Sequence, residues 1–163
     1  MIILGIDPGY ATTGYGVIEK DRNNLVSVDY GVVTTPPTES LPVRLAMLDE
    51  GLTALIRRFK PESIAIEELF FNTNITTGIK VAEARGVILL AAIRECGHLY
   101  EYTPLQVKQA LTGQGRAEKK QVQYMVRALL GLKSEPKPDD AADALAVAVC
   151  HANMQAYRYR TLN

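Results

Sequence analysis

The sequence predicts one α/β domain built on a five-stranded mixed sheet flanked by helices. Three strand-like segments open the chain with only short links, a long amphipathic helix follows, and two further short strands then alternate with helices. A chain of 163 residues gives one domain a sizeable core and leaves little room for a second. We therefore expect a single domain over residues 1–163, with a flexible tail from about residue 155.

The opening segments have the pattern of an antiparallel meander. Residues 1–6 are a continuous apolar run, and the Asp-Pro-Gly sequence at 7–9 favours a turn, so a buried strand ends there. Segments 14–19 and 25–35 predict two more strands, joined by a polar turn at 20–24. Consecutive strands with links this short pair antiparallel.

A helix is expected over 41–59, where leucines recur at spacings of three and four on one face. Ser40 is its expected N-cap, and Pro61 ends it. The segment 63–67 is apolar up to its acidic end, which predicts a fourth strand.

In the second half of the chain, a helix and a strand are followed by helices alone. A long helix is expected over 76–96 and a fifth strand over 99–103. Shorter helices are expected over 104–111, 117–130 and 139–154, separated by glycine and proline. Three strands, a helix, a strand, a helix, a strand and then helices is the element order of an RNase H-like domain.

Composition excludes several classes of protein. The 18 basic and 18 acidic residues give zero net charge, so nucleic-acid binding would depend on a local basic patch. Cys96 and Cys150 lie in apolar helical stretches without zinc-ligand spacing, which favours reduced thiols. The chain shows no signal peptide and no run long enough to span a bilayer, so we expect a cytoplasmic protein.

Four acidic residues lie at the ends of predicted elements. Asp7 ends the first strand and Glu67 the fourth, whereas Asp140 and Asp143 share a face near the start of the last helix. An unpaired carboxylate at the end of a buried strand costs several kcal/mol unless a cation or hydrogen bonds satisfy it. Mg²⁺ prefers such oxygen ligands, and two ions roughly 3.5–4 Å apart can hydrolyse a phosphodiester. The acids together predict a metal-dependent nuclease site.

Strand phase indicates how the acids meet. Alternate strand residues share a face, so Asp7 lies above Gly5, and Glu67 lies above Ala65. Small residues on that face admit a closely packed helix, and the last predicted helix is rich in alanine. We expect this helix to lie on the face of Gly5 and Ala65 and to carry its two aspartates to the other acids.

Each acid also has an ordinary structural interpretation. Asp7 could be a turn residue, and Asp140 could be a first-turn acid that favours the helix dipole. Asp139 is better interpreted as the N-cap of that helix. Glu68 could replace Glu67 as a ligand, but the phase with the small residues below favours Glu67.

Five motifs together resemble one known family. Segments 5–14 (GIDPGYATTG), 65–70 (AIEELF), 106–109 (QVKQ), 117–119 (AEK) and 140–145 (DAADAL) occur in the order and spacing of the RuvC family of Holliday-junction resolvases, the crossover junction endodeoxyribonucleases. The resemblance covers nearly the whole chain. Some family members carry histidine at the third acidic position, where this chain has Asp140.

The resemblance implies a magnesium-dependent DNA endonuclease of recombination and repair. It implies two Mg²⁺ per subunit, with Mn²⁺ as a substitute, and paired symmetric nicks in a four-way junction that leave 5′ phosphates. Family members act as homodimers with the branch-migration proteins RuvA and RuvB. The residues implied as catalytic are Asp7, Glu67, Asp140, Asp143 and Lys119, and the four acids among them are the implied metal ligands.

A local basic excess suits DNA binding. Segment 106–138 holds seven basic residues and two acidic ones. By the resemblance, Lys108 and Lys119 lie near the scissile backbone and Phe70 stacks at the junction, whereas Phe71 is expected to pack in the core. Two further residues expected to bind DNA are Arg116 and Lys120.

Small residues also mark a possible subunit contact. The helix over 76–96 places Gly78, Ala82 and Gly86 at steps of four and is apolar around much of its circumference. This pattern favours a dimer contact, with packing inside one subunit as the alternative.

Two other functions share parts of the pattern. The spacing of Asp7, Gly9, Thr12 and Gly14 resembles the phosphate-binding turn of actin-like phosphotransferases and ATPases, although no second matching turn occurs. An RNase H-like nuclease acting on RNA would need the same acids.

Overall fold

The computed structural model describes residues 1–68 and 75–161, with side chains described as far as residue 155. Its five strands form one mixed sheet in the order β3-β2-β1-β4-β5. Strands β1 and β2 and strands β2 and β3 pair antiparallel, whereas β4 runs parallel to β1 and to β5. The predicted five-stranded mixed sheet is therefore confirmed. The strands are β1 Ile2–Asp7, β2 Thr12–Asp21, β3 Asn24–Thr34, β4 Ser63–Glu67 and β5 Leu99–Tyr102.

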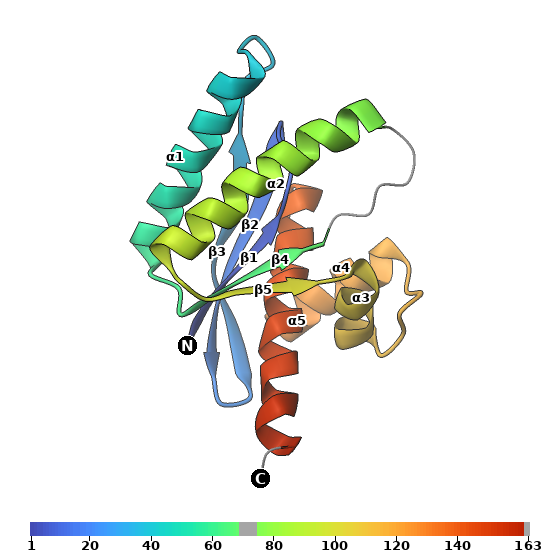
Figure 1. The fold of residues 1–163 in the computed structure, drawn as a ribbon. Coiled ribbons are helices and arrows are strands. Elements are labelled where there is room, and N and C mark those ends of the chain that lie inside the picture. Colours follow the sequence, from blue (N-terminus) through green and yellow to red (C-terminus); the bar gives the residue numbers. More distant parts are fainter. Residues whose placement is uncertain (69–74, 162–163) are drawn as a thin grey trace.

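Helices cover both faces of the sheet (Figure 1). Helices α1 and α2 pack together on one face, α5 crosses the other face, and α3 and α4 pack against α5. None of the described helices is long and apolar enough to cross a membrane. The helices are α1 Leu41–Phe59, α2 Ile75–Glu95, α3 Pro104–Thr112, α4 Lys119–Leu129 and α5 Asp139–Thr161.

The sheet separates two hydrophobic cores because its central strands are apolar on both faces. In β4, Ile64 and Ile66 point toward α1 and α2, whereas Ala65 lies between them on the side of α5. The same alternation in β1 places Leu4 and Ile3 in different cores. The central strands are thus fixed on both sides, and so are the residues at their ends.

Helix α5 packs directly on the sheet through glycines, as predicted. A Cβ atom on Gly5 would lie 2.1 Å from the carbonyl oxygen of Ala144, and one on Gly14 would lie 2.0 Å from that of Asp140. Only glycine fits under a helix backbone at this distance. Because Gly14 pairs with Asp7 across β1 and β2, this contact places the first turn of α5 beside Asp7.

A buried histidine joins the middle of α5 to the sheet. His151 lies within hydrogen-bonding distance of the Tyr102 hydroxyl at Nδ1 (2.7 Å) and of the Ser63 hydroxyl at Nε2 (3.0 Å). Ser63 therefore lies on the face that α5 covers, as the predicted phase of β4 requires. Burial of this network keeps α5 in register with β4 and β5.

The predicted elements are all present, with small shifts at their ends. The main correction concerns the last helix, which runs to Thr161 instead of ending near Met154, since no glycine or proline interrupts it. Ser40 precedes α1 as expected, but its side chain makes no capping hydrogen bond. The side chains from residue 156 onward lie outside the described residues, so the expected tail flexibility stays a prediction.

Candidate active site

The acids at the ends of β1 and β4 come to one edge of the sheet. These strands are adjacent and parallel, with Ile6 in register with Ile66, so Asp7 and Glu67 end side by side. The first turn of α5 lies over Gly14, the pairing partner of Asp7. Carboxylates from three distant parts of the sequence therefore share one region, which brings together the predicted Asp7, Glu67, Asp140 and Asp143.

The ionised carboxylate is strongly disfavoured at Asp7. Burial first, and then the negative charges of Glu67, Asp143 and Asp140, raise the pKa of Asp7 from 3.8 to about 8, although the positive charge of Lys119 opposes the rise. Burial and like charge both disfavour the ionised carboxylate. A buried group of acids with this electrostatic cost is suited to a cation.

The pKa of Glu67 is also raised by burial and like charge. Burial raises its pKa first and the charge of Asp143 adds to the effect, whereas Lys108 and Lys119 lower it. By contrast, the backbone N–H of Glu68 donates to the carbonyl oxygen of Tyr102 and extends the pairing of β4 and β5. The carboxylate that faces the other acids is thus that of Glu67.

Lys119 lies among the acids as the first residue of α4. Its Nζ is 3.2 Å from Asp143 Oδ2 and 3.4 Å from Asp139 Oδ2. Burial raises the pKa of Asp143, and Lys119 opposes that rise. The position of Lys119 follows from a capping box, in which Glu118 and Gln121 bond each other's backbone N–H groups at the helix start.

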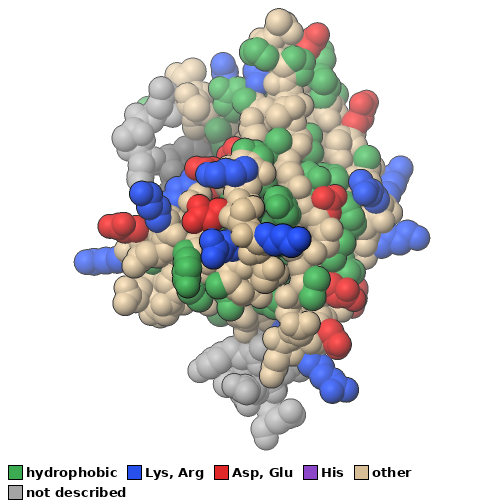
Figure 2. All heavy atoms as spheres, turned by 180° about the vertical axis from the view of Figure 1, so that it is seen from behind, with side chains coloured by type: hydrophobic (Ala, Val, Ile, Leu, Met, Phe, Trp, Pro, Cys, Tyr) green, Lys and Arg blue, Asp and Glu red, His purple; other side chains and the backbone are tan. Residues whose placement is uncertain are grey.

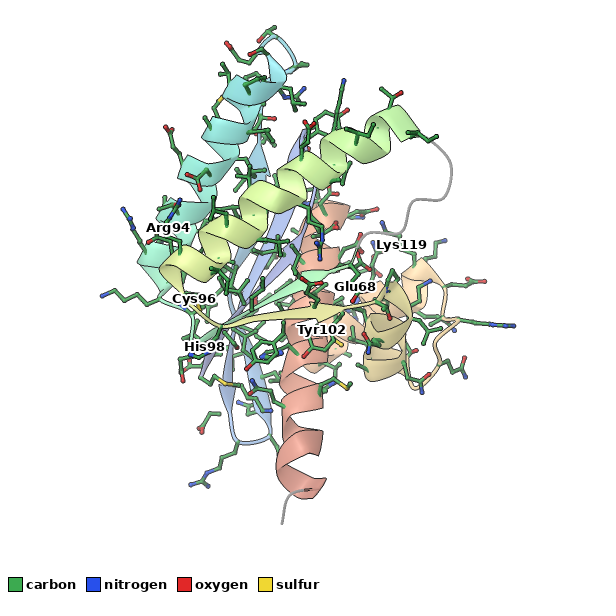
Figure 3. The ribbon with its side chains drawn as sticks, viewed as in Figure 1. Glu68, Arg94, Cys96, His98, Tyr102 and Lys119 are labelled. Carbon is green, nitrogen blue, oxygen red and sulfur yellow. The ribbon has the colours of Figure 1, made fainter. Side chains whose placement is uncertain are left out.

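A pocket of about 210 Å³ opens beside these groups. Lys108 and Lys119 provide its positive charge, whereas Glu67 and Asp143 provide its negative charge. Figure 2 shows acidic and basic side chains intermixed on the face that α5 covers. In Figure 3, Glu68 and Lys119 lie at one end of the sheet, and Arg94, Cys96 and His98 lie at the other. The pocket is lined by Glu67, Pro104, Val107, Lys108, Lys119, Val122, Asp143 and Ala146.

The other residues predicted to bind DNA have different positions. Lys120 lines a separate pocket of about 390 Å³ between α3 and α4, next to Thr112 and Tyr124. Arg116 is exposed in the link between these helices. Phe70 and its neighbour Phe71 lie outside the described residues.

Asp139 belongs to an ion-pair network. It is the first residue of α5 instead of the residue before it, and it pairs with Lys119 and with Lys137 (3.1 Å). The interpretation of Asp139 as an N-cap is therefore wrong, because Pro138 precedes the helix and its carbonyl oxygen already accepts from Ala141. The hydrogen bond from Lys137 lowers the pKa of Asp139, and Lys119 adds to this.

The donor set suits a hard divalent cation. All four acids offer carboxylate oxygens, which Mg²⁺ and Mn²⁺ prefer over nitrogen or sulfur ligands. Within residues 1–68 and 75–155, no three acidic, histidine or cysteine side chains already meet in a metal-ligand cluster. The ammonium group of Lys119 instead lies 3.2 Å from Asp143 Oδ2. Cation binding would then require the carboxylates to turn toward the ion.

Sequence reasoning missed one residue that shapes the site. Thr13 is fully buried, and its hydroxyl bonds the backbone of Gly9, so that the turn after Asp7 is closed. The only sequence signal was the pair of threonines between the two glycines of the first motif. The ion pair of Lys119 with Asp143 was also missed, since the residues are 24 positions apart.

The fold and the site define the class of the protein. A five-stranded mixed sheet with carboxylates at the ends of β1 and β4 and at the start of α5 is the arrangement of RNase H-like metal-dependent nucleases. A family model for the Crossover junction endodeoxyribonuclease RuvC matches residues 3–151. The chain belongs to the RuvC family.

Known proteins are similar to this chain in sequence and in structure along nearly its whole length. The Crossover junction endodeoxyribonuclease RuvC of Rubrobacter xylanophilus is 60% identical over 151 residues, 93% of this chain and 84% of that relative. A structure of Thermus thermophilus RuvC superposes with a TM-score of 0.87 at 40% identity and covers 96% of both chains. The structure of T. thermophilus RuvC in complex with Holliday junction substrate superposes with a TM-score of 0.87 at 37% identity, and the match covers 96% of both chains.

Proposed function

We propose that this chain resolves four-way DNA junctions as a structure-specific endonuclease of homologous recombination and repair, through paired symmetric nicks. The observation that carries the proposal is the convergence of four carboxylates at one sheet edge, where burial and like charge raise the pKa of Asp7 to about 8. Membership of the RuvC family and the likeness to T. thermophilus RuvC in complex with Holliday junction substrate give the substrate class.

The proposed cofactor is a pair of Mg²⁺ ions per subunit, which Mn²⁺ could replace. Asp7, Glu67, Asp140 and Asp143 would hold the ions, because all four are carboxylates and the pKa values of three are raised by burial. When bound, such ions polarise a water molecule for in-line attack and neutralise the leaving oxygen.

Two lysines would position the scissile phosphate. Lys119 lies against Asp143, so that its ammonium group would become available to a phosphate oxygen once a cation takes over that carboxylate. Lys108 lines the same pocket and lowers the pKa of Glu67 through its charge. Val107 and Val122 form an apolar part of the pocket wall.

Residues outside the pocket would hold the rest of the junction. We assign phosphate contacts to Arg116 and Lys120, which are exposed near the pocket on the link and helix that carry Lys119. We assign base stacking to Phe70, which follows the β4 strand by three residues.

A homodimer is proposed because the substrate has two strands to cut. Helix α2 exposes Ile79, Leu90 and Ile93, each more than half exposed, on one stripe with Gly86. A Cβ atom on Gly86 would meet nothing within 4 Å, so that another helix has room to approach there. An exposed apolar stripe of this kind suits an isologous two-fold contact.

The proposed cellular setting follows the family. RuvA and RuvB would move the junction to the dimer, and the cytoplasm, where bacterial DNA lies, is the proposed compartment. The relatives' shared name favours a deoxyribonuclease over a nuclease acting on RNA and over an actin-like phosphotransferase or ATPase.

The test is cleavage of a mobile four-way junction beside a linear duplex and an RNA–DNA hybrid of matched sequence. We expect paired nicks in the junction with Mg²⁺, none with chelator, and none in the other two substrates. Asp7→Asn should bind the junction without cutting it. Cleavage of the hybrid alone, or cleavage by Asp7→Asn, would contradict the assignment.

A further inference from the structure

Two cations and a tyrosine gather on the other side of the acidic site from Lys108 and Lys119. Tyr10 lies three residues after Asp7, in the turn between β1 and β2. The guanidinium carbon of Arg44 is 5.0 Å from the centroid of its ring, and Nζ of Lys80 is 5.8 Å from it. Arg44 comes from α1 and Lys80 from α2, the helices that cover the face opposite α5.

This group, the Tyr10 patch, is held in place by the backbone at the same end of the sheet. Nε of Arg44 donates to Oγ1 of Thr35 (2.9 Å), and Nη2 donates to the carbonyl oxygen of Thr35 (3.3 Å). The hydroxyl of Thr35 in turn donates to the carbonyl oxygen of Tyr10 (2.6 Å). Since Thr35 directly follows β3, the position of Arg44 is fixed relative to the turn that follows Asp7.

The positive charge of the Tyr10 patch has no acidic partner among the residues that the structure describes. Among the described residues, Arg44 and Lys80 have no carboxylate within 4.0 Å, whereas Arg57 and Arg85 each have one and Arg94 has two. Thr35 takes one N–H from each of two guanidinium nitrogens, and a guanidinium carries five N–H donors. Donors of both cations are therefore left for a ligand, and these donors suit an anion.

We propose that the Tyr10 patch binds a backbone phosphate of the DNA on the α1 and α2 side of the cleavage site. The inference rests on the proposed function, because a strand crossing four carboxylates needs compensating charge on both flanks. Lys108 and Lys119 provide it on the side of α3 and α4. In a chain of zero net charge, attraction to DNA has to come from such local patches.

The structure favours a phosphate over a base as the ligand. Both cations lie near the ring of Tyr10, which is half-buried, so the ring acts as a support for the two charges. Two cations side by side recognise charge and not base identity. The Tyr10 patch should therefore position the strand without reading its sequence.

The test compares Lys80→Glu with Arg22→Glu in junction binding. Lys80 is exposed, so its replacement should leave the fold intact; Arg22 is an exposed cation of the β2–β3 turn, at the far end of the sheet from Asp7. Both variants change the net charge equally. Binding to a labelled four-way junction is measured by fluorescence anisotropy with chelator, over a series of salt concentrations.

We expect Lys80→Glu to weaken binding roughly tenfold at about 0.1 M salt and to reduce the slope of log affinity against log salt by about one, as for one lost phosphate contact. Arg22→Glu should change neither. Arg44→Gln should repeat the effect of Lys80→Glu, with its folding checked by urea unfolding.

Equal affinities and equal slopes for Lys80→Glu and Arg22→Glu would overturn the Tyr10 patch while leaving the resolvase assignment intact. If the unsubstituted protein neither binds nor cuts the junction, the proposed function itself fails. A loss of affinity in Lys80→Glu that depends on base sequence and not on salt would also contradict a phosphate contact.

Discussion

Asp7→Asn should make the cation-free protein more stable near neutral pH, although it removes a central group of the site. Burial and the charges of Glu67, Asp143 and Asp140 raise the pKa of Asp7 from 3.8 to about 8. In the unfolded chain Asp7 loses its proton near pH 3.8, but in the folded chain it keeps the proton until about pH 8. The stability contributed by the protonated form is therefore complete at low pH and is lost as the pH rises through this window.

The size of the effect follows from the same shift. Each pH unit between the two pKa values costs about 1.4 kcal/mol, so at about pH 7 the cost to the folded state is roughly 4 kcal/mol. Asparagine has nearly the same shape and no charge, so the variant avoids this cost. At about pH 4 the two proteins should differ little in their free energy of unfolding.

Urea unfolding in chelator at about pH 4 and about pH 7 measures the difference. Asp21→Asn, at the exposed turn of β2 and β3, is the matched control and should show no such gain. Added Mg²⁺ should then stabilise the unsubstituted protein more than Asp7→Asn, because a bound cation repays the repulsion. A gain that is absent, or equal at both pH values, would refute the electrostatic account of the site.

The remaining predictions concern packing, charge and assembly. Gly5→Val places side-chain atoms where the carbonyl oxygen of Ala144 lies, so it should displace α5, cost about 1–3 kcal/mol of stability and abolish Mg²⁺ binding measured by calorimetry. Lys119→Gln removes the cation that holds down the pKa of Asp143, so kcat should fall roughly 10–100-fold and the pH–rate profile should move to higher pH. Leu90→Glu puts a charge on the exposed stripe of α2, so it should convert a dimer to a monomer in sedimentation experiments, and a persistent dimer would exclude this stripe as the contact.

Much of the fold could be predicted because local rules and long-range packing agree. The apolar run of β1, the leucine stripe of α1 and the glycine after α2 each specify an element through its own residues. The end of α5 could not be placed, since the residues beyond Met154 are compatible with helix and carry no stop. Propensity alone does not decide where such a helix ends.

Part of the site was also predictable, because strand phase is a local property. Placing Gly5 and Ala65 on one face predicted which helix covers it, and that helix carries two of the four acids. The choice of Glu67 over Glu68 followed from the same alternation. The electrostatic partners were not predictable, since Lys119 reaches Asp143 from a different helix.

The sequence by itself determined the order of the elements, the faces of the strands and the family, because these depend on neighbouring residues and on motif spacing. Only the tertiary structure decided which charges meet. The ion pairs of Lys119 and the cations beside Tyr10 depend on the angles at which helices cross the sheet. Those angles result from the packing of the whole core, and a direct ion pair needs its charged atoms within about 4 Å of each other, so that small differences in packing decide which pairs form.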